Sequence, residues 1–107
     1  MVARVSTYDV PAERFGEAED RFREALDQIS GMEGLRGYYF LIGQESNRAM
    51  VITLWEGHEA LAASHVTASR LRSDAARSLD GEVLSVDEFT VAFHAQPGLE
   101  LLGRPGD

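Results

Sequence analysis

Two neighbouring segments of the chain are apolar on both of the faces that a β-strand would present. Every residue from Tyr38 to Ile42 is apolar or aromatic. In Ala49–Glu56 two largely apolar sets alternate, one of them Met50, Ile52 and Leu54, the other Val51, Thr53 and Trp55. A strand with one face in water alternates apolar and polar residues. Both faces of the predicted sheet therefore need cover. Helices of the same chain can cover one face, and we expect a second copy to cover the other, which predicts a homodimer.

The remaining periodic segments complete an order of alternating strands and helices. The predicted elements are strands at Val2–Asp9, Leu35–Gly43, Ala49–Glu56 and Glu82–His94, and helices at Pro11–Ser30 and His58–Asp80. This is the ferredoxin-like βαββαβ arrangement, an α+β fold with a four-stranded antiparallel sheet and two helices on one face. Its domain is predicted to span residues 1–94, and the Pro- and Gly-rich residues 95–107 to form a tail.

The sequence also predicts which residues the first helix buries, where the second helix bends and how the last strand divides its side chains between two faces. The first helix is expected to bury Phe15, Ala18, Phe22, Ala25, Leu26 and Ile29, which recur at spacings of three and four. The segment Val66–Ser69 forms helix weakly, so a bend is expected there. Strict alternation in the last strand places Val83, Phe89, Val91 and Phe93 on one face, and Leu84, Val86 and Ala92 on the other.

Composition and charge exclude several classes of function. The 107 residues carry a formal net charge of −8, from 18 acidic and 10 basic side chains. Nucleic acids and anionic membranes need clustered positive charge, so neither is an expected partner. The chain has no cysteine and no lysine, which excludes disulfides, thiolate nucleophiles and Schiff-base chemistry on this chain. The histidines show no metal-ligand spacing. The start of the chain lacks the apolar core of a signal peptide, so a cytoplasmic protein is expected.

Several short motifs, in their order along the chain, resemble those of the antibiotic biosynthesis monooxygenase family of dimeric α/β barrels. They are Met32–Tyr38, then Ala49–Glu56 ending in Leu54-Trp55-Glu56, then Glu59-Ala60-Leu61 and His65. The resemblance covers roughly residues 1–94. It implies a homodimeric barrel with a pocket in each subunit, between the sheet and the helices. Some members oxidise polycyclic aromatic phenols or quinols with O2 and without metal, flavin or haem, because the deprotonated substrate itself activates oxygen.

Such a pocket needs aromatic walls and one or two polar groups. The candidate residues here are His65 as the catalytic group and, for binding an aromatic substrate, Trp55, Tyr8, Tyr38, Tyr39, Phe40 and Arg36. Consecutive residues of a strand face opposite ways, so the run Tyr38–Phe40 divides between the pocket and the partner subunit. Which set lines the pocket is open. Arg36 either pairs with a substrate anion or, as is commoner for an arginine at a strand start, is solvated.

Trp55 and His65 each have a structural and a functional interpretation. Trp55 either packs the following helix onto the sheet or lines the pocket. His65 follows Leu61 by four residues and can share its helix face. With an unperturbed pKa of about 6.5 it can accept a phenol proton, or it is a hydrogen-bonded helix histidine without a catalytic role. A non-enzymatic dimeric binder or scaffold of the same fold remains the alternative function.

A haem-degrading branch of the same superfamily has an asparagine in the first strand, then a tryptophan and a histidine ligand on the later helix. The corresponding residues here are Ser6, His65 and Asp74, and all three depart from that pattern. The comparison predicts no haem binding in the usual manner, although His65 could ligate iron alone. The resemblance to the monooxygenases implies no bound cofactor.

Overall fold

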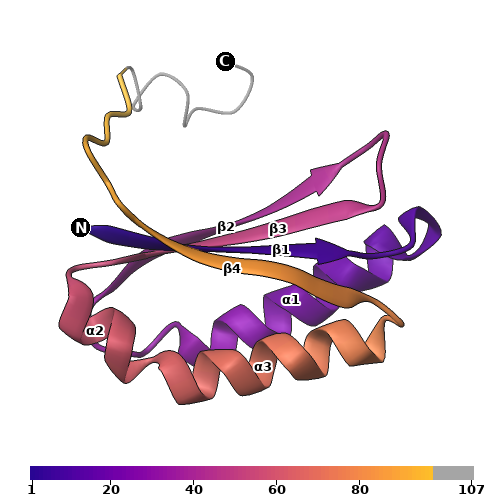
Figure 1. Ribbon diagram of the computed structural model, residues 1–107, viewed down its shortest axis with the longest axis horizontal. Helices are drawn as coiled ribbons and strands as arrows, with labels where there is room; N and C mark the ends of the chain where they lie inside the picture. Colours follow the sequence, from indigo (N-terminus) through magenta and orange to yellow (C-terminus); the bar gives the residue numbers. More distant parts are fainter. Residues whose placement is uncertain (98–107) are drawn as a thin grey trace, which may run out of the picture.

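The computed structural model describes residues 1–97 and has the predicted order of elements (Figure 1). The strands are β1 (Val2–Asp9), β2 (Leu35–Gly43), β3 (Arg48–Trp55) and β4 (Glu82–Thr90); the helices are the short 3-10 helix η1 (Ala12–Arg14), α1 (Phe15–Ile29), α2 (His58–Ala63) and α3 (His65–Ser78). The predicted tail, residues 95–107, lies largely outside the described residues.

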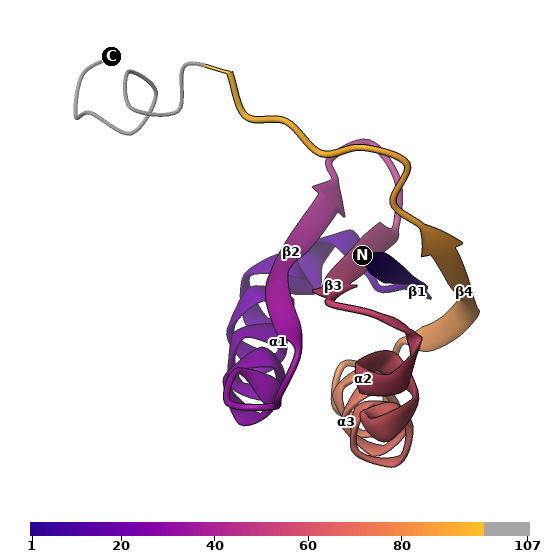
Figure 2. The same ribbon diagram turned by 90° about the vertical axis from the view of Figure 1, so that its left-hand side faces the viewer.

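The four strands form one sheet in the order β2-β3-β1-β4, and each neighbouring pair is antiparallel. Helices α1, α2 and α3 all lie on one face of this sheet, with α1 on the side of β2 and α3 on the side of β4 (Figure 2). The α+β ferredoxin-like fold predicted from the sequence is confirmed. No helix among residues 1–97 is long and apolar enough to cross a membrane.

The core lies between the helices and the two central strands. Alternate residues of β1 and β3 face the helices and are buried: Val2, Arg4, Ser6 and Tyr8, and Ala49, Val51, Thr53 and Trp55. From α1 the buried residues are Ala18, Phe22, Leu26 and Ile29, members of the stripe that the spacing predicted. Trp55 is fully buried, and its indole Nε1 donates a hydrogen bond to Thr53 Oγ1 at 2.9 Å.

The predicted helix His58–Asp80 is divided in two at Ser64, a little before the expected bend at Val66–Ser69. The carbonyl of Leu61 accepts hydrogen bonds from Ser64 Oγ at 2.6 Å and from Arg4 Nη2 at 3.1 Å. A serine hydroxyl that bonds the preceding turn competes with the helical ladder. The break is therefore accompanied by hydrogen bonds of Ser64 and of Arg4, which stands sixty residues earlier in the chain. Helix propensity depends on the local sequence and does not indicate such contacts.

Strand β4 corrects the expectation that Val83 and Phe89 share a face. Val83 pairs with Tyr8, which faces the helices, whereas Phe89 pairs with Ala3 on the outer face. A shift of register between Thr7 and Tyr8 leaves Leu84 as an extra residue in β4, and one extra residue reverses the alternation on either side of it. The strand also ends at Thr90, four residues earlier than predicted.

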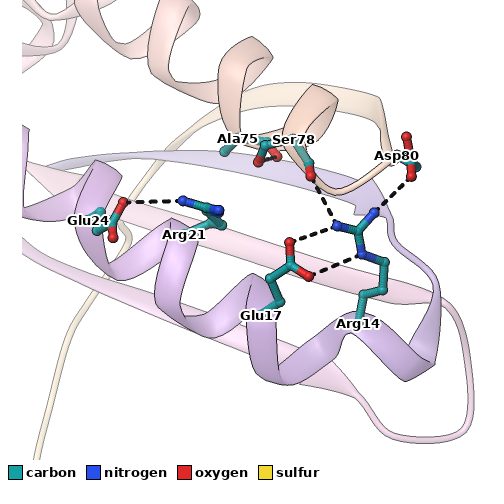
Figure 3. Close-up of polar contacts among 7 residues, drawn as sticks. All are labelled: Arg14, Glu17, Arg21, Glu24, Ala75, Ser78 and Asp80. Atoms are coloured by element: carbon teal, nitrogen blue, oxygen red, sulfur yellow. Dashed lines mark hydrogen bonds and ion pairs between the residues drawn. The ribbon is translucent and has the colours of Figure 1, made fainter.

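Polar contacts join the start of α1 to the turn after α3 (Figure 3). The guanidinium of Arg14 binds Glu17 at 2.7 Å, Asp80 at 2.8 Å and the carbonyl of Ser78 at 3.2 Å. These contacts are exposed, so each contributes little by itself. Together they hold the start of α1 next to the end of α3, at one end of the space between the helices and the sheet.

The outer face of the sheet carries no helix of residues 1–97 (Figures 1 and 2). Strand register assigns to it Tyr39 and Leu41 of β2, Met50, Ile52 and Leu54 of β3, and Phe89 of β4. Tyr39, Leu41 and Phe89 are 45 %, 44 % and 55 % exposed. A contiguous apolar face of this kind is typical of an association surface.

Candidate functional site

A cavity of about 40 Å³ lies between the sheet and the two long helices. The strands contribute Arg4, Ser6 and Tyr8 of β1 and Val51 and Thr53 of β3; the helices contribute Phe22, Ala25, Leu26 and Ile29 of α1 and Ala68, Leu71 and Arg72 of α3. The walls are apolar and the polar groups are few, as in small-ligand sites generally. The cavity is the candidate functional site.

The polar side of the cavity follows from the pleat of β1. Residues two apart in a strand point to the same face, so Arg4, Ser6 and Tyr8 all turn toward the helices, and register places Thr53 of β3 opposite Arg4. The helices supply small side chains at Ala25 and Ala68 together with larger apolar ones. Short side chains opposite a row of polar groups leave an unfilled space.

Arg4 is the most unusual residue of the cavity because its side chain is charged and the residue is only 3 % exposed. Its Nη1 donates to Ser64 Oγ and its Nη2 to the carbonyl of Leu61, both at 3.1 Å. Burial lowers the pKa of Arg4, the nearby guanidinium of Arg72 lowers it further, and Glu88 opposes both. The side chain is thus anchored at the break between α2 and α3, beside a second positive charge.

Tyr8 is the second buried polar group of the cavity and is 2 % exposed. Burial raises the pKa of Tyr8 to about 12, although Arg72 and Ser6 act in the opposite direction. Its ring lies 4.8 Å from that of Phe22, tilted by 59°. At neutral pH the phenol therefore keeps its proton, so it can donate a hydrogen bond to a ligand oxygen and cannot serve as a general base.

The cavity volume limits what fits without movement. A site needs roughly 10–15 Å³ by this measure for one water molecule, so 40 Å³ corresponds to about three. A ring system requires the walls to move apart. Phe22, Leu26 and Leu71 are the bulky apolar side chains that the two helices place there, and side-chain rotation or a small helix shift would enlarge the space.

Of the other predicted site residues, Trp55 lies behind the cavity wall, against Thr53. Tyr38 and Phe40 line a separate hollow of about 340 Å³ beside α1. The two spaces adjoin, because Leu26 lines both and the ring of Phe40 lies 4.9 Å from that of Phe22, nearly parallel to it.

Tyr39 and Arg36 lie apart from both spaces. Tyr39 pairs with Ile52 on the outer face of the sheet. Arg36 is the residue left unpaired where the register between β2 and β3 shifts, and its exposed guanidinium pairs with Glu56 at 3.2 Å. The structure thus separates the run Tyr38–Phe40 as expected, with Tyr38 and Phe40 on the helix side.

His65 is exposed at the start of α3 and lines a surface hollow together with Arg4, His58 and Glu88. That hollow and the cavity between the sheet and the helices share Arg4 as a common wall. The structure therefore does not bring His65 and Tyr8 into one cavity. Residues 1–97 contain no group of three His, Asp or Glu side chains suited to a metal ion.

Arg4, Thr53 and Arg72 are cavity residues that sequence reasoning did not propose, and Ser6 was weighed only for haem. A signal for Arg4 was present. It stands two and four residues before Ser6 and Tyr8 in a predicted strand, so alternation alone puts all three on one face. Arg72 had no such signal, because nothing in its own segment indicates that α3 carries it to the cavity.

Comparison with known proteins places this geometry in context. No curated protein matches the chain. Among solved structures, the cofactor-independent oxygenase SnoaB from Streptomyces nogalater superimposes with a TM-score of 0.69 at 21 % sequence identity, over 90 % of this chain and 96 % of that one. The heme-degrader MhuD from Mycobacterium tuberculosis gives 0.67 at 24 % identity, over 90 % and 100 % of the two chains. A conserved protein from Methanosarcina mazei gives 0.66 at 14 % identity, over 82 % and 89 %.

At these identities the structural likenesses establish the fold. The sequence itself carries the family: residues 1–73 match the model of the family described as antibiotic biosynthesis monooxygenase. That match includes β1, β2, β3 and most of the helical layer. This chain therefore belongs to the antibiotic biosynthesis monooxygenase family.

Proposed function

We propose that this chain is a cofactor-independent monooxygenase that oxidises an aromatic, quinol- or polyketide-like small molecule with O2 in the cavity between the sheet and the helices. The observation that carries the proposal is the composition of that cavity. Arg4, Arg72, the un-ionised phenol of Tyr8 and the hydroxyl side chains of Ser6 and Thr53 line a space whose remaining walls are apolar. This arrangement suits a ring compound that has to lose a proton and hold the resulting negative charge.

The chemistry needs the deprotonated substrate to transfer electrons to O2. For an anthrone-like CH2 group, one oxygen atom becomes the new ring ketone and the other leaves in water, so CH2 and O2 give C=O and H2O. The cavity assists the first step. The charges of Arg4 and Arg72 stabilise a phenolate or enolate in a site of low dielectric, where such charges act strongly. Tyr8 donates a hydrogen bond to the same oxygen.

His65 is proposed as the group that accepts the substrate's proton. It lies in the surface hollow that shares Arg4 with the cavity, so in this proposal it receives the proton at the mouth of the site. Trp55, Tyr38 and Phe40 support the aromatic walls from the side of β2 and β3. Arg36 pairs with Glu56 at the surface, and its proposed contribution to the site is indirect: it stabilises the start of β2.

Oxygen uptake tests the proposal directly. Anthrone-like and quinol substrates are supplied to wild type, Tyr8→Phe and His65→Ala, with an oxygen electrode and product absorbance as readouts. We expect one O2 consumed per CH2 oxidised, with Tyr8→Phe slowed about a hundredfold to a thousandfold by the lost donor. We expect turnover to fall roughly 10²–10⁴-fold in His65→Ala, because the proton acceptor is lost. No uptake with any substrate would refute the enzymatic proposal.

A non-enzymatic ligand-binding role is the second candidate, favoured by the small cavity and by the separation of His65 from Tyr8. It predicts saturable binding of aromatic compounds without O2 consumption. The same samples answer both questions, since calorimetry measures binding and the electrode measures turnover.

Haem is not proposed as a ligand. Of the three positions that depart from the haem-degrading pattern, Ser6 lines the cavity, His65 is exposed, and Asp74 forms a surface pair with Arg77 at 3.6 Å. We expect hemin titration to give no saturable Soret band, and a stoichiometric spectrum would contradict this view.

We also propose that two chains associate through the outer face of the sheet, where the exposed side chains of Tyr39, Leu41 and Phe89 lie. Covering them removes apolar surface from water at roughly 25 cal/mol per Å². Light scattering on a sizing column measures the mass, and a monomer at micromolar concentration would count against the proposal.

A further inference from the structure

We propose, on the basis of the function above, that the substrate of the cavity is an acid: a ring compound with a carboxylate that Arg72 binds at the edge of the cavity while the ring occupies its apolar interior. The arginines of this acidic chain differ in whether a carboxylate supplies their counter-charge, and this difference supports the assignment.

Most arginines of the described chain pair with carboxylates within 4 Å. The pairs are Arg14 with Glu17 and Asp80, Arg21 with Glu24, Arg23 with Glu19, Arg36 with Glu56, Arg48 with Asp9, and Arg77 with Asp74. Arg4, Arg70 and Arg72 have no such partner among residues 1–97. In a chain with 18 acidic side chains and 10 basic ones, a missing partner is not due to a shortage of acids.

Two of these three arginines, Arg4 and Arg72, line the same cavity, and no acidic residue lines it. Glu88 stands opposite Arg4 in the register of β1 and β4, but it lines the surface hollow on the other side of Arg4. Arg72 thus shares the cavity with a second positive charge and with no carboxylate, and a half-buried charge without a counter-charge is costly. An anionic ligand between the two guanidinium groups would supply that counter-charge.

The two arginines differ in what they can offer. Both Nη atoms of Arg4 already donate hydrogen bonds, to Ser64 and Leu61, so Arg4 contributes mainly charge from a fixed position. Arg72 is half-buried and forms no side-chain hydrogen bond with the described residues, so its donors are available. A guanidinium presents two parallel N–H groups that match the two oxygens of a carboxylate. The planar carboxylate also suits a narrow cavity better than a tetrahedral phosphate does.

The test is a binding comparison that requires no turnover. Isothermal titration calorimetry measures the affinity of a naphthoate and of the naphthol with the same ring, at neutral pH, for wild type, Arg72→Gln and Arg70→Gln. Arg70→Gln removes the same charge from the same helix, but its side chain lies in the groove outside the cavity. Circular dichroism verifies that each variant is folded.

We expect wild type to bind naphthoate at least about tenfold more tightly than naphthol, the effect of one charge-assisted contact. Arg72→Gln should remove that preference by weakening naphthoate alone, and Arg70→Gln should retain it. The wild-type preference is informative even if Arg72→Gln does not fold.

The remaining outcomes separate the two proposals. Equal affinity for both compounds in wild type overturns the carboxylate inference and leaves the cavity as a ligand site. A loss in Arg70→Gln as large as that in Arg72→Gln also overturns it, because general surface charge would then account for the preference. Binding of neither compound removes the ligand site itself, and with it the proposed function.

Discussion

Gly34 offers the sharpest test of the architecture around the site. It precedes β2 with a φ of +86°, and its carbonyl accepts a hydrogen bond from the backbone N–H of Glu56 at 2.7 Å. A Cβ added at this position would collide with the Cβ of Ala60 in α2. The glycine thus brings the loop before β2 against the helix that follows β3.

Two separate terms make Gly34→Ala destabilising. A left-handed backbone costs a residue with a Cβ about 1–2 kcal/mol, and forcing a methyl group into a packed contact costs about 1–3 kcal/mol. The sum is about 2–5 kcal/mol. For a domain of this size it lowers the melting temperature by roughly 10–25 °C.

Urea unfolding followed by circular dichroism measures the loss, and Gly16→Ala is its control. A Cβ at Gly16, in the first turn of α1, meets no atom within 4 Å. That change should be neutral or stabilise by up to about 1 kcal/mol, because alanine favours the helix and restricts the unfolded chain.

A double-mutant cycle with Ala60→Gly then separates the two terms. Removing the Cβ of Ala60 should recover the steric part of the loss and leave the backbone part. If the free energy of unfolding of Gly34→Ala lies within about 0.5 kcal/mol of the wild-type value, then neither the left-handed backbone at Gly34 nor its close approach to Ala60 is correct.

Three further predictions concern the core, the cavity and the outer face. Leu79 is fully buried and Val66 is 78 % exposed. Leu79→Ala should therefore lower the free energy of unfolding, measured by urea titration, by about 2–5 kcal/mol. Val66→Ala should lower it by under about 0.5 kcal/mol. Burial raises the pKa of Tyr8 to about 12, while unfolded tyrosine titrates near about 10. The unfolded state therefore loses this proton first, and the free energy of unfolding should fall by up to about 2–3 kcal/mol between these pH values; an equal fall in Tyr8→Phe would refute this assignment. If two chains associate through the outer face as proposed, Ile52→Glu on that face should shift the light-scattering mass from dimer to monomer; a dimer mass retained in this variant would contradict the proposed interface.

Local patterns in the sequence were sufficient for the fold. The alternation in Ala49–Glu56 and the spacing of Phe22, Leu26 and Ile29 depend on which residues stand two, three or four apart, and burial then follows from the geometry of a strand or a helix. The match of residues 1–73 to the family agrees with the motifs that the same segments carry. Both faces of β3 are largely apolar, so only the structure showed which side faces the helices and that Trp55 is fully buried.

The candidate site was decided by contacts between distant residues. Arg4 reaches Ser64 across sixty positions of the chain, and this contact accompanies the break that begins α3 and brings Arg72 to the cavity. One extra residue in β4 reversed the faces of Val83 and Phe89. The sequence by itself determined which elements form and in what order, because those depend on neighbours along the chain. Only the tertiary structure decided which polar groups meet, since that depends on register, bulges and helix breaks set by packing.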